Sequence, residues 1–415
     1  MNTDFQDLCI DKGRFQKSFE ALATIGGTPE GGVHRPAYSQ AHLEARRWFL
    51  AAAQGAGLEA SIDGAGNHSA LLRCGSPGAR TLLLGSHLDS VPCGGRFDGA
   101  LGVVAALEVL RAVKDQGLRL GTHLEAVDFT DEEGRYANFV GSLGLTGRLE
   151  QNDIQHPRGG REAFRAALAR AGLSEDSLFT AGRDPATLAG YLELHVEQGG
   201  RLAERGISIG IVTGIVGIRS FKIRFLGRAD HAGTTPMGQR LDAVQGAAAF
   251  ALAVRERVMA RFPDCVATVG NMEFEPGAFN VVAQRVTVFL EFRATEEATL
   301  DRMEALLREQ AAAVAGRFRL GLEIENPDRA APAHMDGGVQ AAFAGACEGL
   351  GLSRTYLASG AGHDAQCLAA ICPAGMIFVP SVEGRSHSAL EFTEWEDCVN
   401  GANVLLRAAV AVAGE

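Results

Sequence analysis

Residues 81–134 place two short apolar runs on either side of a long helical segment, and this order most constrains the fold. The run TLLLGSH (81–87) is typical of a buried strand, and DGALGVVAALEVLRAVKDQG (98–117) follows as a long helix closed by glycine. THLEAVDFTDEEG (122–134) again begins as a strand and ends in an acidic loop. Strand, helix and strand in this order predict an α/β catalytic domain. We expect a mixed central sheet with flanking helices and a site at the carboxyl edge of the strands.

A different order of elements begins near residue 213. Strands are expected at 217–227, 265–276, 280–294 and 320–326, and helices at 241–262 and 296–318. The order strand–helix–strand–strand–helix–strand is that of a ferredoxin-like module. We therefore expect residues 213–329 to be inserted into a catalytic domain that is formed by residues 1–212 and 330–415.

Length and composition exclude several kinds of partner. The 415 residues suggest two domains, and a formal net charge of −11 with a pI near 5.5 argues against nucleic acid or an anionic membrane surface as partner. No apolar stretch reaches the ~18 residues of a bilayer span, and we expect no signal peptide. The eight cysteines are scattered without a C-x-x-C motif, so we expect reduced thiols and a cytoplasmic location.

Four segments place polar side chains where the strands of the sheet are expected to end. They are GSHLDSVPCGGRFDG with His87, Asp89 and Asp98, DEEG with Glu132 and Glu133, ELHVEQGG with His195, and GRSHSALE with His387. Any one of them alone is ordinary, because single histidines after strands are usually structural and acidic triplets are usually solvated turns. Together, three histidines and two carboxylates at one sheet edge form a nitrogen and oxygen donor set that suits zinc or manganese.

The number of donors favours two ions over one. Five side chains exceed a tetrahedral site, and a bridging carboxylate would divide them between two ions about 3.5–4 Å apart that share a water. Asp98, which glycines flank, is the expected bridge. Asp89 is expected to accept the second ring N–H of His87 and so fix its tautomer. Of the adjacent residues Glu132 and Glu133, one can hold metal while the other receives a proton from the water.

These segments, together with RADHAGTTPM, SGAGHDAQ and VPSVEGRSHSALE, resemble the hydantoinase/carbamoylase family of dimetal amidohydrolases, in order and over nearly the whole chain. That family includes N-carbamoyl-L-amino acid hydrolase, allantoate amidohydrolase and β-ureidopropionase. The resemblance implies two divalent ions per subunit, zinc or else manganese, cobalt or nickel. It assigns His87, Asp98 and His195 to one ion, and Asp98, Glu133 and His387 to the other. Glu132 then corresponds to the general base.

The resemblance extends into the inserted module, where it implies a lid and dimerisation domain. In the homodimer, His231 would reach the partner's active site and stabilise the oxyanion. Asn280 and Arg293 would hold the carboxylate of the substrate, because the planar guanidinium of Arg293 can donate two parallel hydrogen bonds to it. Gln198 and the backbone of Gly362 would complete the pocket.

One departure from the family concerns EEGRYANFVGS, where the family commonly continues with Ser-Arg-Phe and a longer loop. Here Arg135 and Tyr136 follow, and we expect them to lie near the pocket and to bear on the choice of substrate. The sequence thus predicts a hydrolase of linear C–N bonds, with an N-carbamoyl-L-amino acid as the first candidate substrate. The alternatives are allantoate or N-carbamoyl-β-alanine as substrate, a metallo-aminoacylase or peptidase with the same metal centre, and a non-catalytic metal-bearing binding protein.

Overall fold

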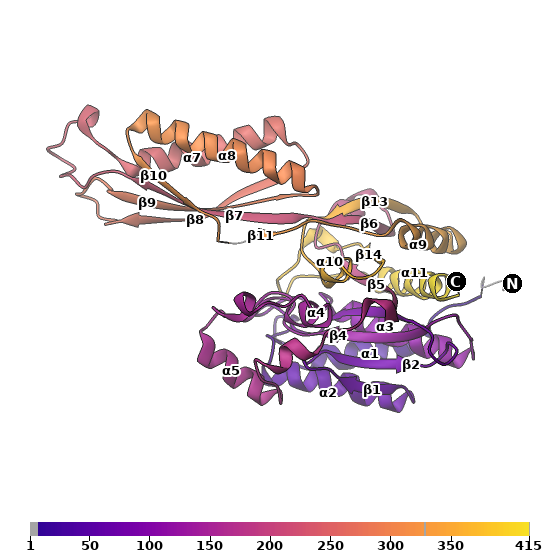
Figure 1. Ribbon diagram of the computed structural model, residues 1–415. Helices are drawn as coiled ribbons and strands as arrows, with labels where there is room; N and C mark the ends of the chain where they lie inside the picture. The colour runs from indigo at the N-terminus through magenta and orange to yellow at the C-terminus, as the bar shows by residue number, and fades with distance from the viewer. Residues whose placement is uncertain (1–6, 328, 415) are drawn as a thin grey trace. The chain divides into compact units, whose positions relative to one another are not determined.

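The computed structural model describes residues 7–327 and 329–414, which divide into two units (Figure 1). Of these residues, the first unit takes those up to Thr213, His334–Ser359 and those from His363 onward. The second unit takes Gly214–Ala333 and Gly360–Gly362. The sequence predicts that the inserted module spans residues 213–329. The main segment of the second unit spans residues 214–333.

The first unit is built around a mixed β-sheet. Its strands are β1 (Glu59–Ile62), β2 (His68–Leu72), β3 (Thr81–His87), β4 (His123–Phe129), β5 (Leu188–Val196), β6 (Ile209–Ile215), β12 (Ala333–His334), β13 (Arg354–Ser359) and β14 (Ala374–Val379). Their order is β1-β2-β4-β3-β5-β14-β6-β12, and β13 also pairs with β6. The central strands β4, β3, β5 and β14 run parallel to one another. Parallel strands covered on both faces explain the continuous apolar runs of the sequence.

Helices cover this sheet. They are α1 (Lys12–Thr24), α2 (Gln40–Gly55), α3 (Ala100–Asp115), α4 (Val140–Leu145), α5 (Arg161–Arg170), α6 (Arg201–Arg205), α9 (Gly337–Leu350), α10 (Asp364–Leu368) and α11 (Trp395–Ala413), with the short 3₁₀ helices η1 (Gln151–Ile154), η2 (Ser177–Thr180), η3 (Pro185–Thr187) and η5 (Val382–Gly384). Every residue of α3 from Ala100 to Leu110 is buried, so this helix forms the centre of the core. The strand and helix expected at 81–87 and 98–117 are confirmed as β3 and α3.

The second unit has the element order expected from the sequence. It contains β7 (Gly217–Leu226), η4 (Met237–Gln239), α7 (Ala243–Arg261), β8 (Val266–Glu275), β9 (Arg285–Ala294), α8 (Glu297–Phe318), β10 (Gly321–Glu325) and β11 (Arg329–Ala330). The sheet is antiparallel, with the order β10-β7-β9-β8 and β11 beside β7. Burial alternates strictly along β7, because α7 and α8 lie on one face of the sheet (Figure 1).

One strand of the second unit is shorter than the sequence suggests. The strand expected at 280–294 begins only at Arg285. Residues before it bond instead to the loop around His231, because the amide of Ala232 donates to the carbonyl of Asn280 and Val281 forms a bridge with His231. An apolar run that looks like the start of a strand is therefore held by a loop.

The chain leaves and re-enters the first unit at neighbouring points. Strands β6 and β12 are adjacent in the sheet, and the amide of Met335 donates to the carbonyl of Thr213 at 3.0 Å. No described helix combines the length and the apolar character that crossing a bilayer requires.

Candidate metal centre

Neighbouring parallel strands bring the polar side chains to one edge of the first sheet. His87 is the last residue of β3 and lies opposite Phe129, the last residue of β4, from which the chain runs on to Glu132 and Glu133. His195 lies near the end of β5, opposite Phe378 of β14. Strands that run in the same direction end at the same edge, so the expected convergence follows from the topology.

The first group of donors comprises His87, Asp98 and His195, whose candidate ligand atoms all lie within 4.8 Å of one another. Oδ1 of Asp98 lies 4.0 Å from Nε2 of His87 and 3.1 Å from Nε2 of His195. The His195 nitrogen is buried and makes no hydrogen bond despite this short distance. Gly99 has a φ of +64°, and a Cβ there would lie 2.4 Å from the ring of His87, so glycine lets the Asp98 loop approach the ring.

The second group comprises Asp98, Glu133 and His387. Nε2 of His387 lies 3.5 Å from Oδ2 of Asp98 and 3.6 Å from Oε2 of Glu133. Asp98 thus presents one carboxylate oxygen to each group, which is the geometry of a bridging ligand. Gln198 lies against the same atoms, with its Nε2 3.2 Å from Oδ2 of Asp98 and 3.5 Å from Nε2 of His387.

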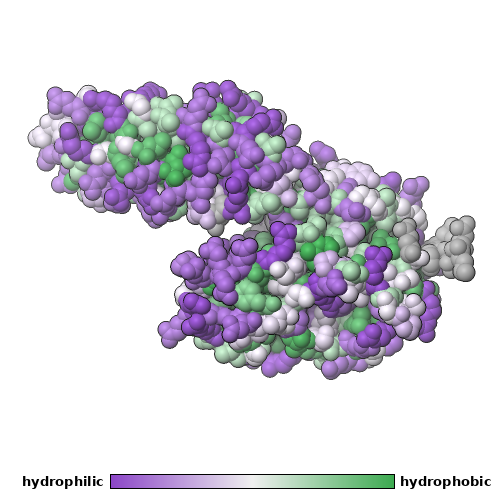
Figure 2. Space-filling model, viewed as in Figure 1, coloured by the Kyte–Doolittle hydropathy of each residue, from purple (hydrophilic) through white to green (hydrophobic). Residues whose placement is uncertain are grey.

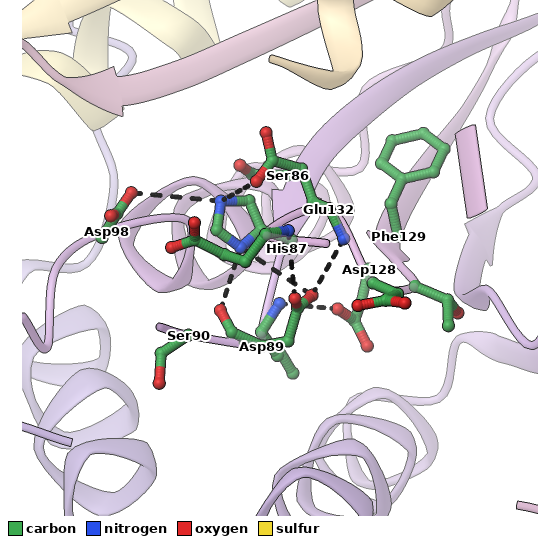
Figure 3. A network of polar contacts seen from close by, with 12 residues as sticks. Ser86, His87, Asp89, Ser90, Asp98, Asp128, Phe129 and Glu132 are labelled. Carbon is green, nitrogen blue, oxygen red and sulfur yellow. Dashed lines mark hydrogen bonds and ion pairs between the residues drawn. The ribbon is translucent and has the colours of Figure 1, made fainter. Parts of the chain in front are cut away.

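Glu132 and Asp89 lie beside the first group, as Figure 3 shows. Oε2 of Glu132 is 3.5 Å from Nε2 of His87. The prediction that the Asp89 carboxylate accepts the second ring N–H of His87 is wrong. Nδ1 of His87 bonds to the backbone carbonyl of Asp89 at 3.0 Å, whereas the carboxylate lies 4.0 Å away. The carboxylate instead accepts the amides of Glu132 and Glu133, at 3.3 and 3.2 Å, and so fixes the acidic turn.

Burial and the neighbouring carboxylates shift the pKa values of the side chains in the centre. Burial, with the neighbouring Glu133 and Asp364, raises the pKa of Glu132 well above its usual range. Burial and then Asp98 raise the pKa of Glu133 to about 10. Burial lowers the pKa of His87 to about 4, although the nearby Asp98 acts in the opposite direction. The lowered pKa favours the neutral ring, which is the form that binds a metal ion.

The donor set also contains buried atoms without partners among the described residues. Oε1 of Glu133 and Nε2 of His195 make no hydrogen bond, although native proteins usually satisfy such atoms. Two histidine nitrogens with a carboxylate, beside a second group that shares this carboxylate, fit two divalent ions.

A buried ion pair that supports the centre was not predicted from the sequence. Oδ2 of Asp128 accepts from Nε of Arg46 at 3.0 Å, and Oδ1 accepts from the amide of Leu88 at 2.8 Å. Both charged side chains are buried, which anchors the backbone between His87 and Asp89. In the sequence, Arg46 is one charge in a helix and Asp128 one acid near a strand end, and 82 positions separate them.

Non-glycine residues in the left-handed region of φ gather at this edge. Asp131, Gln198 and His387 have φ values of 52°, 58° and 52°. Such backbone costs about 1–3 kcal/mol per residue and persists where surrounding contacts impose it. Asp131 shows how, because its carboxylate accepts the amides of Arg135, Tyr136 and Ala137.

Of the two residues that depart from the family pattern, only one reaches the surface. Tyr136 is buried, and its ring centroid lies 6.0 Å from that of Tyr38 and 5.3 Å from that of Phe164. It therefore serves a small local core. Arg135 is exposed beside it.

The remaining candidate residues belong to the second unit. Nδ1 of His231 accepts the amides of Gly233 and Thr234 at 3.1 and 3.3 Å. The segment of Asn280 bonds to the same loop. Arg293 donates to Oε1 of Glu291 and, at 2.7 Å, to the carbonyl of Gly360, so it contacts the segment that contains Gly362.

Comparison with known proteins defines the class. The family model described as Peptidase family M20/M25/M40 matches residues 83–411. An N-carbamoyl-L-amino acid amidohydrolase of Geobacillus stearothermophilus is 38% identical over 398 residues, 95% of this chain and 97% of that protein. A ureidoglycolate hydrolase of Arabidopsis thaliana is 33% identical over 96% of this chain and 86% of its own. The crystal structure of a hydantoinase/carbamoylase family amidase from Burkholderia multivorans has a TM-score of 0.88 at 35% identity and covers 99% of both chains.

Fold and site together are those of a metal-dependent amidohydrolase. The chain belongs to the peptidase family M20/M25/M40 and, within it, to the hydantoinase/carbamoylase family.

Proposed function

We propose that the protein hydrolyses a linear ureido or amide C–N bond, and that its substrate is an N-carbamoyl-L-amino acid, released as the L-amino acid, CO2 and ammonia. The observation that carries this proposal is Asp98, whose two carboxylate oxygens face separate groups of donors. The name of the Geobacillus stearothermophilus relative supports the choice of substrate. The Arabidopsis thaliana relative favours ureidoglycolate as a second candidate with the same ureido chemistry.

His87, Asp98 and His195 would hold one divalent ion, and Asp98, Glu133 and His387 the other. Zinc suits these donors, and so do manganese, cobalt and nickel. Such ions polarise a carbonyl and lower the pKa of water. The cytoplasmic location expected from the sequence stays a prediction.

Glu132 would take the proton of the attacking water and deliver it to the leaving nitrogen. Its position suits this role, because the side chain is almost buried and lies beside His87 without belonging to either group of donors. Asp89 would hold Glu132 in place through the backbone amides of the acidic turn.

His231 would stabilise the oxyanion. Because its Nδ1 accepts two backbone amides, the proton of the neutral ring is on Nε2, which can then donate to a developing negative charge. Arg293, with Asn280, would bind the carboxylate of the substrate through its planar guanidinium. Gln198 and the backbone of Gly362 would complete the pocket.

We further propose a homodimer formed through the second unit, with His231 acting in the partner's site. Strand β8 is at the edge of its sheet and exposes Val266 and Phe274. Helix α7 exposes Leu252 and Met259, two helical turns apart on one face. Figure 2 shows hydrophobic residues on the otherwise mainly hydrophilic surface of the second unit. An unpaired edge and an apolar stripe suit a two-fold interface.

A substrate panel tests the activity. Ammonia release is measured for N-carbamoyl-L- and D-amino acids, N-carbamoyl-β-alanine, allantoate and ureidoglycolate, and amine release for N-acetyl amino acids and dipeptides. The N-carbamoyl-L-amino acids should give the highest kcat/KM. N-acetyl or dipeptide substrates that outrun every ureido compound would replace this function with that of an acylase or peptidase.

Subunit mixing tests the shared site. Glu132→Gln and His231→Ala subunits, each inactive alone, should regenerate activity in heterodimers, because one of the two sites would contain both native residues. A mixture that stays inactive after confirmed subunit exchange would place His231 in its own subunit's site or outside catalysis.

A further inference from the structure

A buried carboxylate outside both groups of donors joins the loops that carry them. Glu391 lies between His387 and α11 and is 4% exposed. Its Oε1 accepts the backbone amides of Phe97 and Asp98, at 3.1 and 3.0 Å. Its Oε2 accepts the hydroxyl of Ser386 at 2.8 Å. The first contact holds the backbone of the bridging aspartate, and the second holds the residue that directly precedes His387.

The packing around this carboxylate is tight. A Cβ on Gly95 would lie 2.0 Å from Oε1 of Glu391 and 2.1 Å from its Cδ, so the carboxylate occupies the space where any other residue would place a side chain. A Cβ on Gly32 would lie 2.5 Å from the carbonyl oxygen of Gly94 and 2.8 Å from Cα of Ala389. The segments around Gly32, Gly95 and Ala389, which are distant in sequence, therefore pack closely together, and at Gly95 they do so against the Glu391 carboxylate.

We propose that Glu391 is a positioning residue that holds the Asp98 loop and the His387 loop at the separation the second metal ion requires. The proposal rests on the metal-binding function proposed above. Glu391 is not itself among the donors, because its two oxygens already accept three hydrogen bonds. Residues that orient metal ligands change metal affinity by about 10–100-fold when they are removed.

Glu391 acts most strongly on the second group. His387 belongs to that group alone, its side chain is 53% exposed, and its backbone has a φ of 52°. His87 and His195 are buried at the ends of strands and have little freedom to move. Loss of the carboxylate should therefore weaken the second ion more than the first.

Metal affinity measured directly tests this role. Zinc or manganese is titrated into metal-free wild type, Glu391→Ala and Glu391→Gln, and both dissociation constants are determined together with kcat and KM. Glu391→Ala should weaken the second ion by about 10–100-fold and lower kcat, with a smaller change in KM. Glu391→Gln should recover most of the affinity, because its amide oxygen can accept the two backbone amides and its nitrogen can donate to Ser386.

Gly95→Ala provides an independent test, because the added methyl group must displace the carboxylate while the backbone at Gly95 lies outside the left-handed region. It should reproduce the effect of Glu391→Ala. The double variant should be no worse than either single variant, since removing the carboxylate makes room for the methyl group. Gly345→Ala is the matched control, because no atom lies within 4 Å of its added Cβ, and it should bind both ions like wild type.

The outcomes separate the two proposals. Unchanged affinity for both ions in Glu391→Ala would overturn the positioning role, as would failure of Glu391→Gln to restore the second ion or full additivity of the Gly95→Ala and Glu391→Ala effects. If Glu391→Ala does not fold, the Gly95→Ala and Glu391→Gln results decide. A wild type that binds two ions but hydrolyses no ureido or amide compound would overturn the proposed function alone. A wild type that binds no ion would overturn both.

Discussion

Two clusters of buried charge, one in each unit, differ in how their charges are paired. In the first unit, Oε1 of Glu133 and Nε2 of His195 are buried and make no hydrogen bond with a described residue, although Nε2 of His195 lies 3.1 Å from the Asp98 carboxylate. In the second unit, the two terminal nitrogens of the buried Arg219 guanidinium donate to Glu297, Asp301 and Glu304 at 2.6, 2.7 and 2.8 Å, while its Nε makes no hydrogen bond with a described residue.

Burying a charge is costly unless it is paired, so the excess of buried carboxylates in the first unit favours the binding of cations, whereas the chain itself supplies the counter-charges of Arg219. The comparison teaches that buried carboxylates and imidazoles gathered without enough cationic partners mark a site for cations. The predictions below test this contrast, from the largest expected effect to the smallest.

Removal of metal should abolish activity and destabilise the first unit alone. An ion present at 1,000 times its dissociation constant stabilises the state that binds it by about 4 kcal/mol, and among the described residues the donor groups all lie in the first unit. Calorimetry after chelation should show a lowered transition for the first unit and an unchanged one for the second. Zinc, manganese, cobalt or nickel should restore activity to different degrees. Full activity with no metal detected by elemental analysis would refute the metal centre.

Glu132→Gln should separate catalysis from metal binding. Loss of the general base should lower kcat by at least ~10²-fold, whereas metal content and thermal stability should stay at the wild-type level because Glu132 belongs to neither group. Steady-state kinetics and elemental analysis measure the two effects. Near wild-type turnover in this variant would remove the proposed mechanism.

Arg293→Ala should affect the substrate without affecting the metals. Losing charge-assisted bonds to a carboxylate should raise KM by about 10–100-fold. Arg285→Ala on the same strand is the matched control, since this arginine bonds to the exposed Glu275, and it should leave KM unchanged. Equal KM values in the two variants would separate Arg293 from substrate binding.

Arg219→Met should destabilise the second unit by about 1–3 kcal/mol, because three carboxylates lose their shared partner but remain partly hydrated. Urea unfolding of the metal-loaded protein measures the loss. Arg224→Met, whose partners Glu323 and Glu325 are more than half exposed, should cost less than about 1 kcal/mol. A loss that appears in the first unit's transition would contradict the contrast between the units.

Parts of the structure that depend on local sequence could be predicted. β3 and α3 follow from an apolar run, a glycine loop and a closing glycine. His87 and His195 could be brought together because each ends an apolar run and parallel topology brings such ends to one edge, whereas the assignment of Asp98 to one ion with them came from the family resemblance.

Parts that depend on competition between partners could not be predicted. Spacing suggested that Asp89 would bond to the ring of His87, but the backbone carbonyl takes that place while the carboxylate accepts the amides of the acidic turn. Glu391 stands in a segment singled out from the sequence, yet its partner Asp98 is 293 positions away. The sequence around Glu391 and the sequence around Asp98 do not predict this hydrogen bond.

The adjacency of β6 and β12 has a consequence for how the sequence of this chain can evolve. The entropic cost of closing a loop grows only with the logarithm of its length, and here the closure is made by strands of the first unit's own sheet. The segment between Thr213 and His334 can therefore lengthen, shorten or be exchanged at little thermodynamic cost to the sheet that carries the metal-binding side chains. Under the function proposed above, carboxylate binding and subunit assembly would then diverge through this one segment, with His231 retained, while the donor groups of the first unit are inherited unchanged.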